Sequence, residues 1–322
     1  MDNRRFGDME LSPLGLGCWA IGGPFWEGDK PLGWGEVNDK ESISAIHAGL
    51  DAGINLIDTA NIYGAGHSEY VVGKAIKHRR DKVIVSSKFG FDADEKTKQM
   101  KGVFTQPHEI EAMCENSLRR LGTDYLDIYF LHLNDHPIDE VEHIQATLEN
   151  LVTAGKIRRY GWSTDFADRA QHFAQQDNCS AIQFELNVLS DNSELVAVCE
   201  RNNVAGFNRG PLAMGLLGGK YDNGGTLSES DVRKISPDWM KYFHDGVPSP
   251  ELLKKLGLIR EILTSNGRTV SQGALAWLWA RSPNSVPIPG FRTVEQSLSN
   301  AKAMEFGPLA ASQMEEIARL LR

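Results

Sequence analysis

Four ionisable side chains stand at or just after the ends of short apolar runs in the first half of the chain. Asp58 ends one run, Tyr63 follows it by five residues, Lys88 ends the next run, and His132 ends the third. A carboxylate, a phenol, an ammonium and an imidazole can hold or transfer protons when they are brought together. Each residue alone also has a purely structural explanation. The aspartate could form a turn or cap a helix, the lysine could be solvated, the tyrosine could serve packing, and the histidine could be a hydrogen-bonded core residue. Together they indicate one site, provided that the fold brings the ends of the runs together.

The elements that would have to position these side chains are short strands that alternate with amphipathic helices. We expect eight strands, at residues 14–19, 54–59, 82–88, 126–132, 157–163, 181–186, 204–208 and 285–290. The helical patterns lie at residues 39–52, 68–78, 107–121, 139–154, 166–175, 193–201, 251–266 with 270–281, and 293–303. Eight such pairs predict an α/β fold, a (β/α)8 barrel of the TIM type, in which the carboxyl ends of the strands meet at one face.

The barrel is expected to span residues 1–322 as a single domain, with an additional C-terminal helix near 309–322. Barrels of this kind commonly need more than about 200 residues, and no linker-like stretch divides the sequence. One competing pattern lies in the first strand, where Gly15, Gly17 and Ala20 match the GxGxxA fingerprint of a doubly wound dinucleotide-binding fold. That fingerprint requires a helix directly after it, whereas a stretch rich in glycine and proline follows here. The barrel is therefore favoured.

The composition argues against several functional classes. The net charge of −9 disfavours nucleic acid or a membrane surface as a partner, because either would require clustered Lys and Arg. The four cysteines form no CxxC pair, which fits a reducing compartment and neither a zinc site nor a disulfide framework. No run reaches the ~18 apolar residues of a membrane helix, and the first residues lack the apolar core of a signal peptide. We expect a cytoplasmic protein, a monomer or a homo-oligomer, without a metal site.

Nearly the whole chain, from about residue 5 to residue 300, resembles the aldo-keto reductase superfamily. The matching motifs are GLGCWAIGG, DTANIYGAGHSE, SSKFG, LRRLGTDYLDIYFLH, GKIRRYGWS, IQFELN, GPLAMGLLGGKY and IPGFRTVEQSLSN. The resemblance implies hydride transfer between a nicotinamide cofactor and a small-molecule carbonyl or alcohol. The cofactor that it implies is NADPH/NADP+, with NADH less favoured.

The resemblance also implies a role for each of the four ionisable residues. Tyr63 would be the general acid that meets the negative charge developing on the carbonyl oxygen. The Lys88 ammonium would lower the pKa of that phenol from its usual value near 10. Asp58 would pair with Lys88 and orient it. His132, in its neutral form, would hydrogen-bond the substrate oxygen and set its orientation.

Cofactor-binding positions are implied in the same way, residue by residue. Those at the nicotinamide end are Ser163, Thr164, Gln183 and Arg209. Those in the loop over the pyrophosphate are Gly210, Pro211, Leu212, Leu217 and Lys220. Those at the adenosine end are Gly290, Arg292, Gln296 and Asn300, with Arg233 as a second contact to the 2′-phosphate. The charge of Arg292 close to a helix start would favour that phosphate, and so NADPH over NADH.

Two of these positions depart from the family pattern. Thr164 stands where relatives often carry Asn, so its contact with the carboxamide is an open question. Arg209 stands where many relatives carry an aromatic residue that stacks on the nicotinamide. A guanidinium plane can also stack on a ring. Because the oxidised ring is cationic and the reduced ring is neutral, we hypothesise that Arg209 disfavours NADP+ relative to NADPH.

The substrate pocket is expected to be shaped by Trp19, Trp26 and Trp34 in the early loops, with ordinary loop packing as the alternative. Asn134 or Asp135 would suit a hydroxylated substrate such as a sugar aldehyde, but they suit an exposed loop equally well. The long connection 221–250 is a candidate lid over the cofactor, because connections beyond ~12–15 residues are usually functional or disordered.

The leading hypothesis is therefore NADPH-dependent reduction of an aldehyde or ketone, sugar-derived carbonyls included. One alternative is an enzyme that works mainly as an alcohol dehydrogenase. The other is a non-catalytic NADPH-binding regulatory subunit, a role known in this superfamily. Because all four candidate catalytic positions are filled, an enzyme is favoured.

Overall fold

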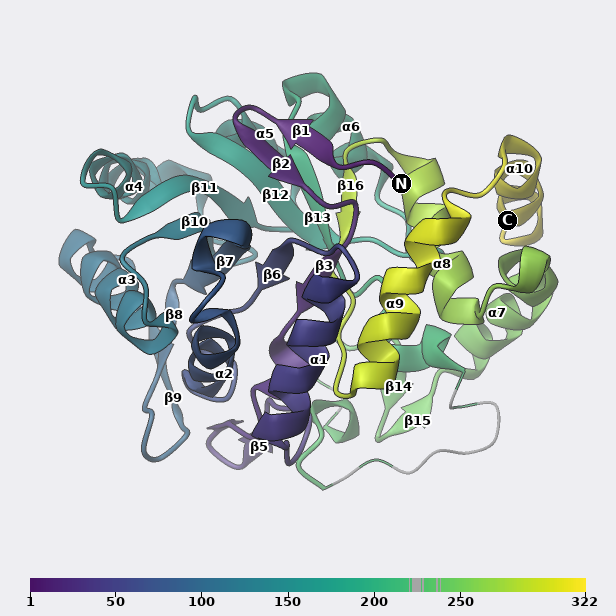
Figure 1. The fold of residues 1–322 in the computed structure, drawn as a ribbon, viewed down its shortest axis with the longest axis horizontal. Helices are drawn as coiled ribbons and strands as arrows, with labels where there is room; N and C mark the ends of the chain where they lie inside the picture. The colour runs from purple at the N-terminus through teal and green to yellow at the C-terminus, as the bar shows by residue number, and fades with distance from the viewer. Residues whose placement is uncertain (220, 222–226, 228, 236, 238) are drawn as a thin grey trace.

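The computed structural model contains the predicted barrel; it describes residues 1–219, 221, 227, 229–235, 237 and 239–322. Eight parallel strands form the main sheet, in the order β16-β13-β12-β11-β10-β7-β6-β3. Their bounds are β3 (Gly15–Gly17), β6 (Leu56–Asp58), β7 (Ile84–Phe89), β10 (Leu126–Leu131), β11 (Ile157–Ser163), β12 (Cys179–Glu185), β13 (Ala205–Arg209) and β16 (Ser285–Pro287). The sheet curls into a nearly closed barrel surrounded by helices (Figure 1).

The two edge strands of this sheet meet at glycines. An isolated parallel bridge joins Gly17 to Gly290, and the Gly17 N–H donates to the Pro289 carbonyl at 3.0 Å. A Cβ on Gly17 would lie 2.5 Å from the Ile288 carbonyl oxygen, so no side chain fits there. The glycines that match the dinucleotide fingerprint therefore lie where the barrel closes. The first strand, predicted at 14–19, spans only three residues, as do the strands predicted at 54–59 and 285–290.

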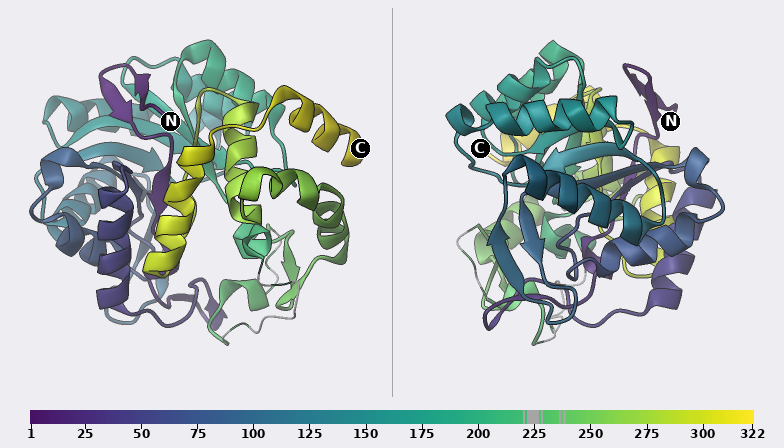
Figure 2. Two further views of the ribbon diagram at one scale, coloured as in Figure 1. Left: turned by 45° about the vertical axis from the view of Figure 1, so that its right-hand side comes forward. Right: turned by 90° about the vertical axis from the view of Figure 1, so that its left-hand side faces the viewer.

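Helices cover the outside of the barrel close to the predicted positions. Their bounds are α1 (Asp39–Asp51), α2 (His67–Ile76), α3 (Pro107–Leu121), α4 (Glu142–Thr153), α5 (Ala167–Ala174), α6 (Ser193–Asn202), α7 (Pro250–Leu263), α8 (Val270–Arg281), α9 (Val294–Phe306) and α10 (Ala311–Leu320). The helix predicted at 139–154 is divided into a 3-10 turn at Ile138–Glu140 and α4. The additional C-terminal helix α10 lies outside the ring, beside α7 (Figure 2).

Short antiparallel hairpins, which the sequence patterns did not predict, lie at both ends of the barrel (Figure 1). They are β1 (Arg4–Phe6) with β2 (Met9–Leu11), β4 (Trp26–Glu27) with β5 (Lys30–Pro31), β8 (Phe91–Ala93) with β9 (Met100–Val103), and β14 (Phe243–His244) with β15 (Val247–Pro248). The first hairpin carries Phe6, Met9 and Leu11, which are buried with the side chains that fill the barrel interior. It therefore closes the end that holds the amino termini of the strands, and the chemistry is left to the other end.

Between the sheet and the helices lies the larger apolar core. The cysteines are all free and buried in it or beside it. No helix among the described residues is long and apolar enough to cross a membrane.

Candidate active site

The alternation of side chains along the strands brings three of the candidate catalytic residues into the mouth of the barrel. Asp58 is the last residue of β6, and Lys88 lies near the end of β7 beside inward-facing Phe130. His132 directly follows β10, where its backbone N–H donates to the Phe89 carbonyl at 2.7 Å. Strand ends that are far apart in sequence therefore meet, as the prediction required.

The Lys88 ammonium is fully buried and uses its three N–H donors on three partners. Its Nζ lies 2.7 Å from Asp58 Oδ2, 2.7 Å from the Thr59 carbonyl oxygen and 3.1 Å from the Tyr63 hydroxyl. An ammonium has no acceptor, so the Tyr63 oxygen accepts this hydrogen bond. The proton of Tyr63 is therefore not used on Lys88.

The Asp58 carboxylate is held by one group from the neighbouring strand β7 and one from β12, across the barrel. Its Oδ1 accepts from Ser86 Oγ at 2.8 Å and from Gln183 Nε2 at 2.9 Å, while Oδ2 faces Lys88. A buried charge requires such donors. The ion pair is consequently fixed in orientation.

The turn that carries Tyr63 approaches the turn after β3 so closely that only glycine fits. A Cβ on Gly64, whose φ is +61°, would lie 1.7 Å from the Gly22 carbonyl oxygen. Ser68, at the start of α2, donates from its hydroxyl to the Cys18 carbonyl at 2.9 Å. Together these contacts hold the turn against the barrel mouth and give Tyr63 a defined position.

Burial and charge act in opposite directions on Tyr63. Burial raises the pKa of the phenol and outweighs the opposing effect of Lys88, so the pKa lies above its ordinary value. The sequence predicted the lysine's contribution but not this net direction. Burial also acts to lower the pKa of Lys88, but Asp58 and Tyr63 together raise it above its ordinary value. At neutral pH the site therefore holds a protonated phenol beside a charged ammonium.

His132 lies against Tyr63, with ring centroids 6.1 Å apart in an edge-to-face arrangement. Burial, reinforced by the charges of Lys88 and Arg209, lowers its pKa well below the ordinary value, so the imidazole is neutral. Its Nδ1 is buried and has no hydrogen-bond partner among the described residues.

Tryptophans surround the outer side of Tyr63. The Trp19 ring stacks on Tyr63 at 5.9 Å, and Trp34 meets Trp19 edge-on at 5.5 Å. Trp239, which the sequence did not single out, lies 6.3 Å from Trp19 and is 53% exposed. Trp26 lies in hairpin β4–β5, where its backbone N–H donates to the Lys98 carbonyl. The sequence offered one signal for Trp239: it is an aromatic residue within 221–250, the connection predicted to cover the mouth.

The predicted carboxamide contacts come together at the ends of β11 and β12. Ser163 Oγ lies 3.3 Å from Gln183 Oε1, and both side chains are buried. The Thr164 hydroxyl instead donates to the Asn134 carbonyl at 2.6 Å. Asn134 and Asp135 are exposed. Ser163 and Gln183 thus present polar groups at the centre of the mouth, while Thr164 holds a loop.

Arg209, at the end of β13, forms ion pairs that the sequence did not predict. Its Nη2 contacts Asp165 Oδ2, and its Nη1 lies 4.0 Å from Glu185 Oε2. The side chain of Arg209 is 35% exposed and that of Asp165 is 30% exposed. Two carboxylates therefore offset part of the positive charge on which the hypothesis about NADP+ depends.

The loop expected over the pyrophosphate follows β13 directly. Gly210 has a φ of +59°, and its carbonyl accepts from Asn187 Nδ2 at 3.0 Å. Pro211 and Leu217 are buried, and Leu212 is partly buried. Lys220 lies outside the described residues.

Arg233 connects this loop to other segments of the mouth. It forms an ion pair with Asp231, donates from Nη1 to the Met214 carbonyl at 3.2 Å, and stacks over Trp34 at 4.5 Å. The Val232 N–H donates to the Gly33 carbonyl at 2.8 Å. Part of the predicted lid, 221–250, lies outside the described residues. The part that contains Val232 and Arg233 is joined to the loop after β3.

The remaining cofactor positions lie around the start of α9. Arg292 is exposed, and its guanidinium donates to the carbonyls of Trp34 and Glu36. Gln296 Oε1 accepts from the Arg292 backbone N–H at 2.7 Å. Gly290 is exposed, and buried Asn300 points its Nδ2 toward the Gly290 carbonyl at 3.5 Å. Arg292 therefore directly precedes Thr293, the N-cap of α9, while its guanidinium lies against the carbonyls of the early loop.

Chemically, these groups suit a dinucleotide. Amide and hydroxyl groups at the barrel centre match a carboxamide, and the open space at Gly290, where a Cβ would meet nothing closer than 4.0 Å, leaves room for a ligand. A guanidinium at a helix start matches a phosphate. Among the described residues, no three His, Cys, Asp or Glu side chains are grouped so that they could hold a metal ion.

Comparison with known proteins agrees with this geometry. A model of the Aldo/keto reductase family matches residues 13–322. The aldo-keto reductase YhdN of Bacillus subtilis is 34% identical over 289 residues, covering 88% of this chain and 82% of the relative. The NADH-specific methylglyoxal reductase of Escherichia coli is 30% identical over 332 residues, covering 98% of this chain and 97% of the relative.

Solved structures are similar over nearly the full length. A glycerol dehydrogenase from Gluconobacter oxydans has a TM-score of 0.81 at 30% identity and covers 99% of this chain and 95% of that one. An aldo-keto reductase from Klebsiella pneumoniae in complex with NADPH has a TM-score of 0.72 at 27% identity, with the same shares covered. The barrel fold and these matches place the chain in the class of NADP-dependent oxidoreductases. The chain belongs to the aldo/keto reductase family, which confirms the resemblance of its motifs.

Proposed function

We propose that this enzyme reduces an aldehyde or ketone to the alcohol with NADPH, and that Tyr63 is its general acid. The observation that carries the proposal is the use of the Lys88 donors. Because the lysine donates to the phenol oxygen at 3.1 Å, the phenol keeps its own proton for another acceptor. A carbonyl oxygen that gains negative charge is such an acceptor.

When bound, the cofactor supplies the hydride that is transferred to the carbonyl carbon. The chain's own groups then act on the oxygen. Tyr63 donates its proton, and Lys88 stabilises the phenolate that remains, since it is charged and 3.1 Å away. Asp58 holds the ammonium in place at 2.7 Å. Neutral His132, whose ring lies against Tyr63, orients the carbonyl oxygen toward the phenol.

For the cofactor, we propose the set of residues carried over from the family motifs. Ser163 and Gln183 would hold the carboxamide, and Arg292 the 2′-phosphate. Arg233 has little capacity left for that phosphate, because its hydrogen bonds to Asp231, Met214 and Tyr221 use four of its five N–H donors. The similarity to the NADPH complex from Klebsiella pneumoniae supports NADPH, whereas the similarity to an NADH-specific reductase makes a comparison of both cofactors necessary.

One observation supports the reverse reaction, oxidation of an alcohol, as a second candidate function. The solved glycerol dehydrogenase from Gluconobacter oxydans covers the chain at 30% identity, so oxidation of a polyol is the alternative. In that direction Tyr63 would have to be a phenolate. Because burial raises the pKa of Tyr63, neutral pH favours the protonated phenol and hence reduction.

The test is Tyr63→Phe, which removes only the hydroxyl. We expect kcat for reduction of a generic aldehyde to fall by roughly 10³-fold, within the range for a positioned acid. The Kd of NADPH, followed by its fluorescence, should stay within about twofold. Wild-type activity in Tyr63→Phe would remove the proposed acid. NADPH binding without turnover by the wild type, over a broad panel of carbonyls and alcohols, would favour a binding module.

A further inference from the structure

Outside the barrel, directly behind strand β7, which carries Lys88, lies a second buried ion pair. Its partners are Glu69 and Arg120. The Glu69 carboxylate is 0% exposed; its Oε2 lies 2.6 Å from Arg120 Nε and its Oε1 accepts from Ser87 Oγ at 2.5 Å. Glu69 is the last residue of the motif DTANIYGAGHSE, but it is not among the candidate catalytic or cofactor-binding residues. Because desolvation of two charges offsets much of their attraction, a buried ion pair is weak evidence for a stabilising role. The pair is better explained by the position that it gives to Ser87.

Ser87 precedes Lys88 on β7, and neighbouring residues of a strand point to opposite faces. Lys88 therefore reaches Tyr63 inside the barrel while Ser87 reaches Glu69 outside it. Glu69 lies in the first turn of α2, six residues after Tyr63. The strand that carries the ammonium and the segment that carries the phenol are thus joined on both faces.

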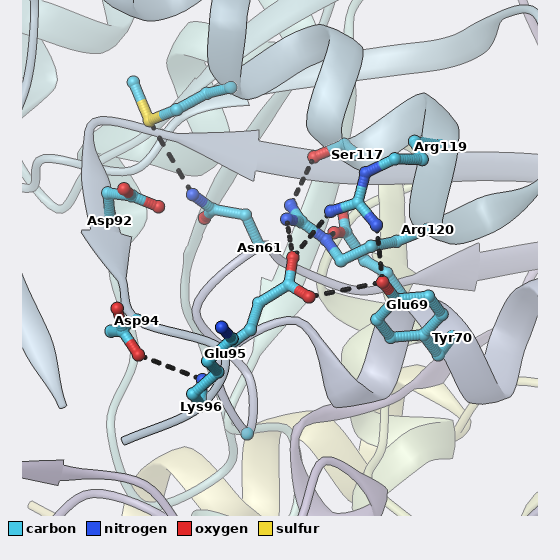
Figure 3. A network of polar contacts seen from close by, with 12 residues as sticks. Asn61, Glu69, Tyr70, Asp92, Asp94, Glu95, Lys96, Ser117, Arg119 and Arg120 are labelled. Carbon is cyan, nitrogen blue, oxygen red and sulfur yellow. Dashed lines mark hydrogen bonds and ion pairs between the residues drawn. The ribbon is translucent and has the colours of Figure 1, made fainter. Parts of the chain in front are cut away.

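The network extends away from the barrel to hold Glu69 itself (Figure 3). Arg120 Nη1 lies 3.0 Å from Glu95 Oε1, and Arg119 Nη2 lies 2.7 Å from the same oxygen. The Arg120 side chain passes so close to Gly66 that a Cβ there would lie 2.7 Å from its Cδ. Arg120 is therefore fixed between the start of α2, its own helix α3 and the loop between β8 and β9.

We propose that Glu69 is a positioning residue that, by holding Ser87 from outside the barrel, sets the distance between Lys88 and Tyr63. This inference rests on the proposed role of Tyr63 as the acid. Without the outer bond, β7 and the start of α2 can separate, and the inner contact of 3.1 Å lengthens. The ammonium then stabilises the phenolate less.

The direction in which the pKa of Tyr63 shifts separates a positioning role of Glu69 from a purely electrostatic one. The groups that act on Tyr63 are Lys88, Asp58 and Arg209, and the His132 ring lies against it. Those beside Glu69 are Arg120, Cys114 and Tyr129. A longer contact with Lys88 raises the pKa of Tyr63, because Lys88 acts to lower it. If Glu69 acted only through its negative charge, removing that charge would lower the pKa of Tyr63.

The experiment uses Ser87→Ala, which changes no charge. We expect kcat for aldehyde reduction to fall about tenfold, as small misplacements of catalytic groups do, with the KM of the aldehyde and the Kd of NADPH within about twofold. In protein labelled with ¹³C at tyrosine Cζ, Tyr63 should ionise about one pH unit higher, the equivalent of a tenfold loss. Its resonance is assigned by its absence in Tyr63→Phe.

Three further variants complete the set. Ser87→Thr keeps the hydroxyl and should restore kcat and the ionisation of Tyr63. Glu69→Leu, which removes both the charge and the acceptor for Ser87, should shift that ionisation in the same direction as Ser87→Ala. Glu95→Gln also replaces a carboxylate partner of Arg120 but does not touch Ser87, so kcat should stay within about twofold of the wild type. Circular dichroism and urea unfolding verify that each variant is folded.

Unchanged kcat and unchanged ionisation of Tyr63 in folded Ser87→Ala would overturn the inference, as would a shift to lower pH in folded Glu69→Leu. Full activity in Tyr63→Phe would instead remove the proposed function. The NMR titration needs neither cofactor nor turnover, so the two failures are distinguishable.

Discussion

Two buried ion pairs at opposite ends of the barrel differ in what their cations do with the remaining donors. At the carboxyl ends of the strands, Lys88 gives two N–H groups to Asp58 and a carbonyl and the third to the Tyr63 phenol. At the amino ends, Asp127 accepts from Arg80 and Arg158 and from the Val85 N–H. The other Arg80 donors go to backbone carbonyls and a threonine hydroxyl.

Burial of charge alone therefore does not mark a catalytic group. Asp58 and Asp127 are both about 3% exposed. Only the first pair has a third partner that can give up a proton. Parallel strands give the barrel this polarity, with chemistry at the carboxyl ends and stability at the amino ends.

The largest effect is expected from Lys88→Met, which removes the cation and keeps most of the side-chain volume. Without it the phenolate loses its stabilising partner, and kcat should fall by at least ~100-fold. Asp58 would be left buried without its ion-pair partner, at a cost of about 3–5 kcal/mol in the free energy of unfolding. Steady-state kinetics and urea unfolding measure the two effects.

The double variant Lys88→Met with Asp58→Asn is the control for that prediction. It removes both charges, so stability should recover while kcat stays low. Recovery of kcat together with stability would mean that Lys88 acts only through the fold.

A smaller effect, confined to stability, is expected from Asp127→Asn. Two arginines lose their shared carboxylate, but the Arg80 side chain is 15% exposed and the Arg158 side chain is 60% exposed. The free energy of unfolding should therefore fall by about 2–3 kcal/mol, somewhat less than for a fully buried pair. Urea unfolding gives this value, and kcat of the folded protein should be unchanged. A kcat loss as large as that of Lys88→Met would break the division between the two ends.

The smallest effect is expected at the partly exposed ion pair of Arg209 and Asp165. If Arg209 disfavours the cationic ring, Arg209→Tyr should lower the ratio of the NADP+ and NADPH dissociation constants. Because Asp165 and Glu185 already offset the charge, we expect less than the ~1.4 kcal/mol of a tenfold change. Calorimetry with both cofactors measures the ratio, and Arg209→Lys serves as the charge-conserving control. An unchanged ratio in Arg209→Tyr contradicts the hypothesis.

Much of the fold and the four candidate catalytic positions could be predicted because the signals are local. Alternation of short strands with helices indicated the barrel, and Asp58, Lys88 and His132 stand at strand ends that any such barrel gathers. Three strands were predicted too long: those expected at 14–19, 54–59 and 285–290 each span three residues. The need for glycine in the first of them could not be predicted, because it comes from the contact of Gly17 with Ile288, which is far away in the sequence. The hairpins at the two ends were missed, because two or three residues per strand leave no period to detect.

The amino-acid sequence by itself determined the family, the barrel and which ionisable groups stand at the strand ends. The tertiary structure alone decided how those groups share their hydrogen bonds. Lys88 and Tyr63 are 25 positions apart and Gln183 and Asp58 are 125 apart, yet both pairs are in contact. Burial, which raises the pKa of Tyr63 although Lys88 acts to lower it, is likewise a sum over the packed chain. Hydrogen bonds and desolvation depend on distances through space, and those exist only once the barrel is closed.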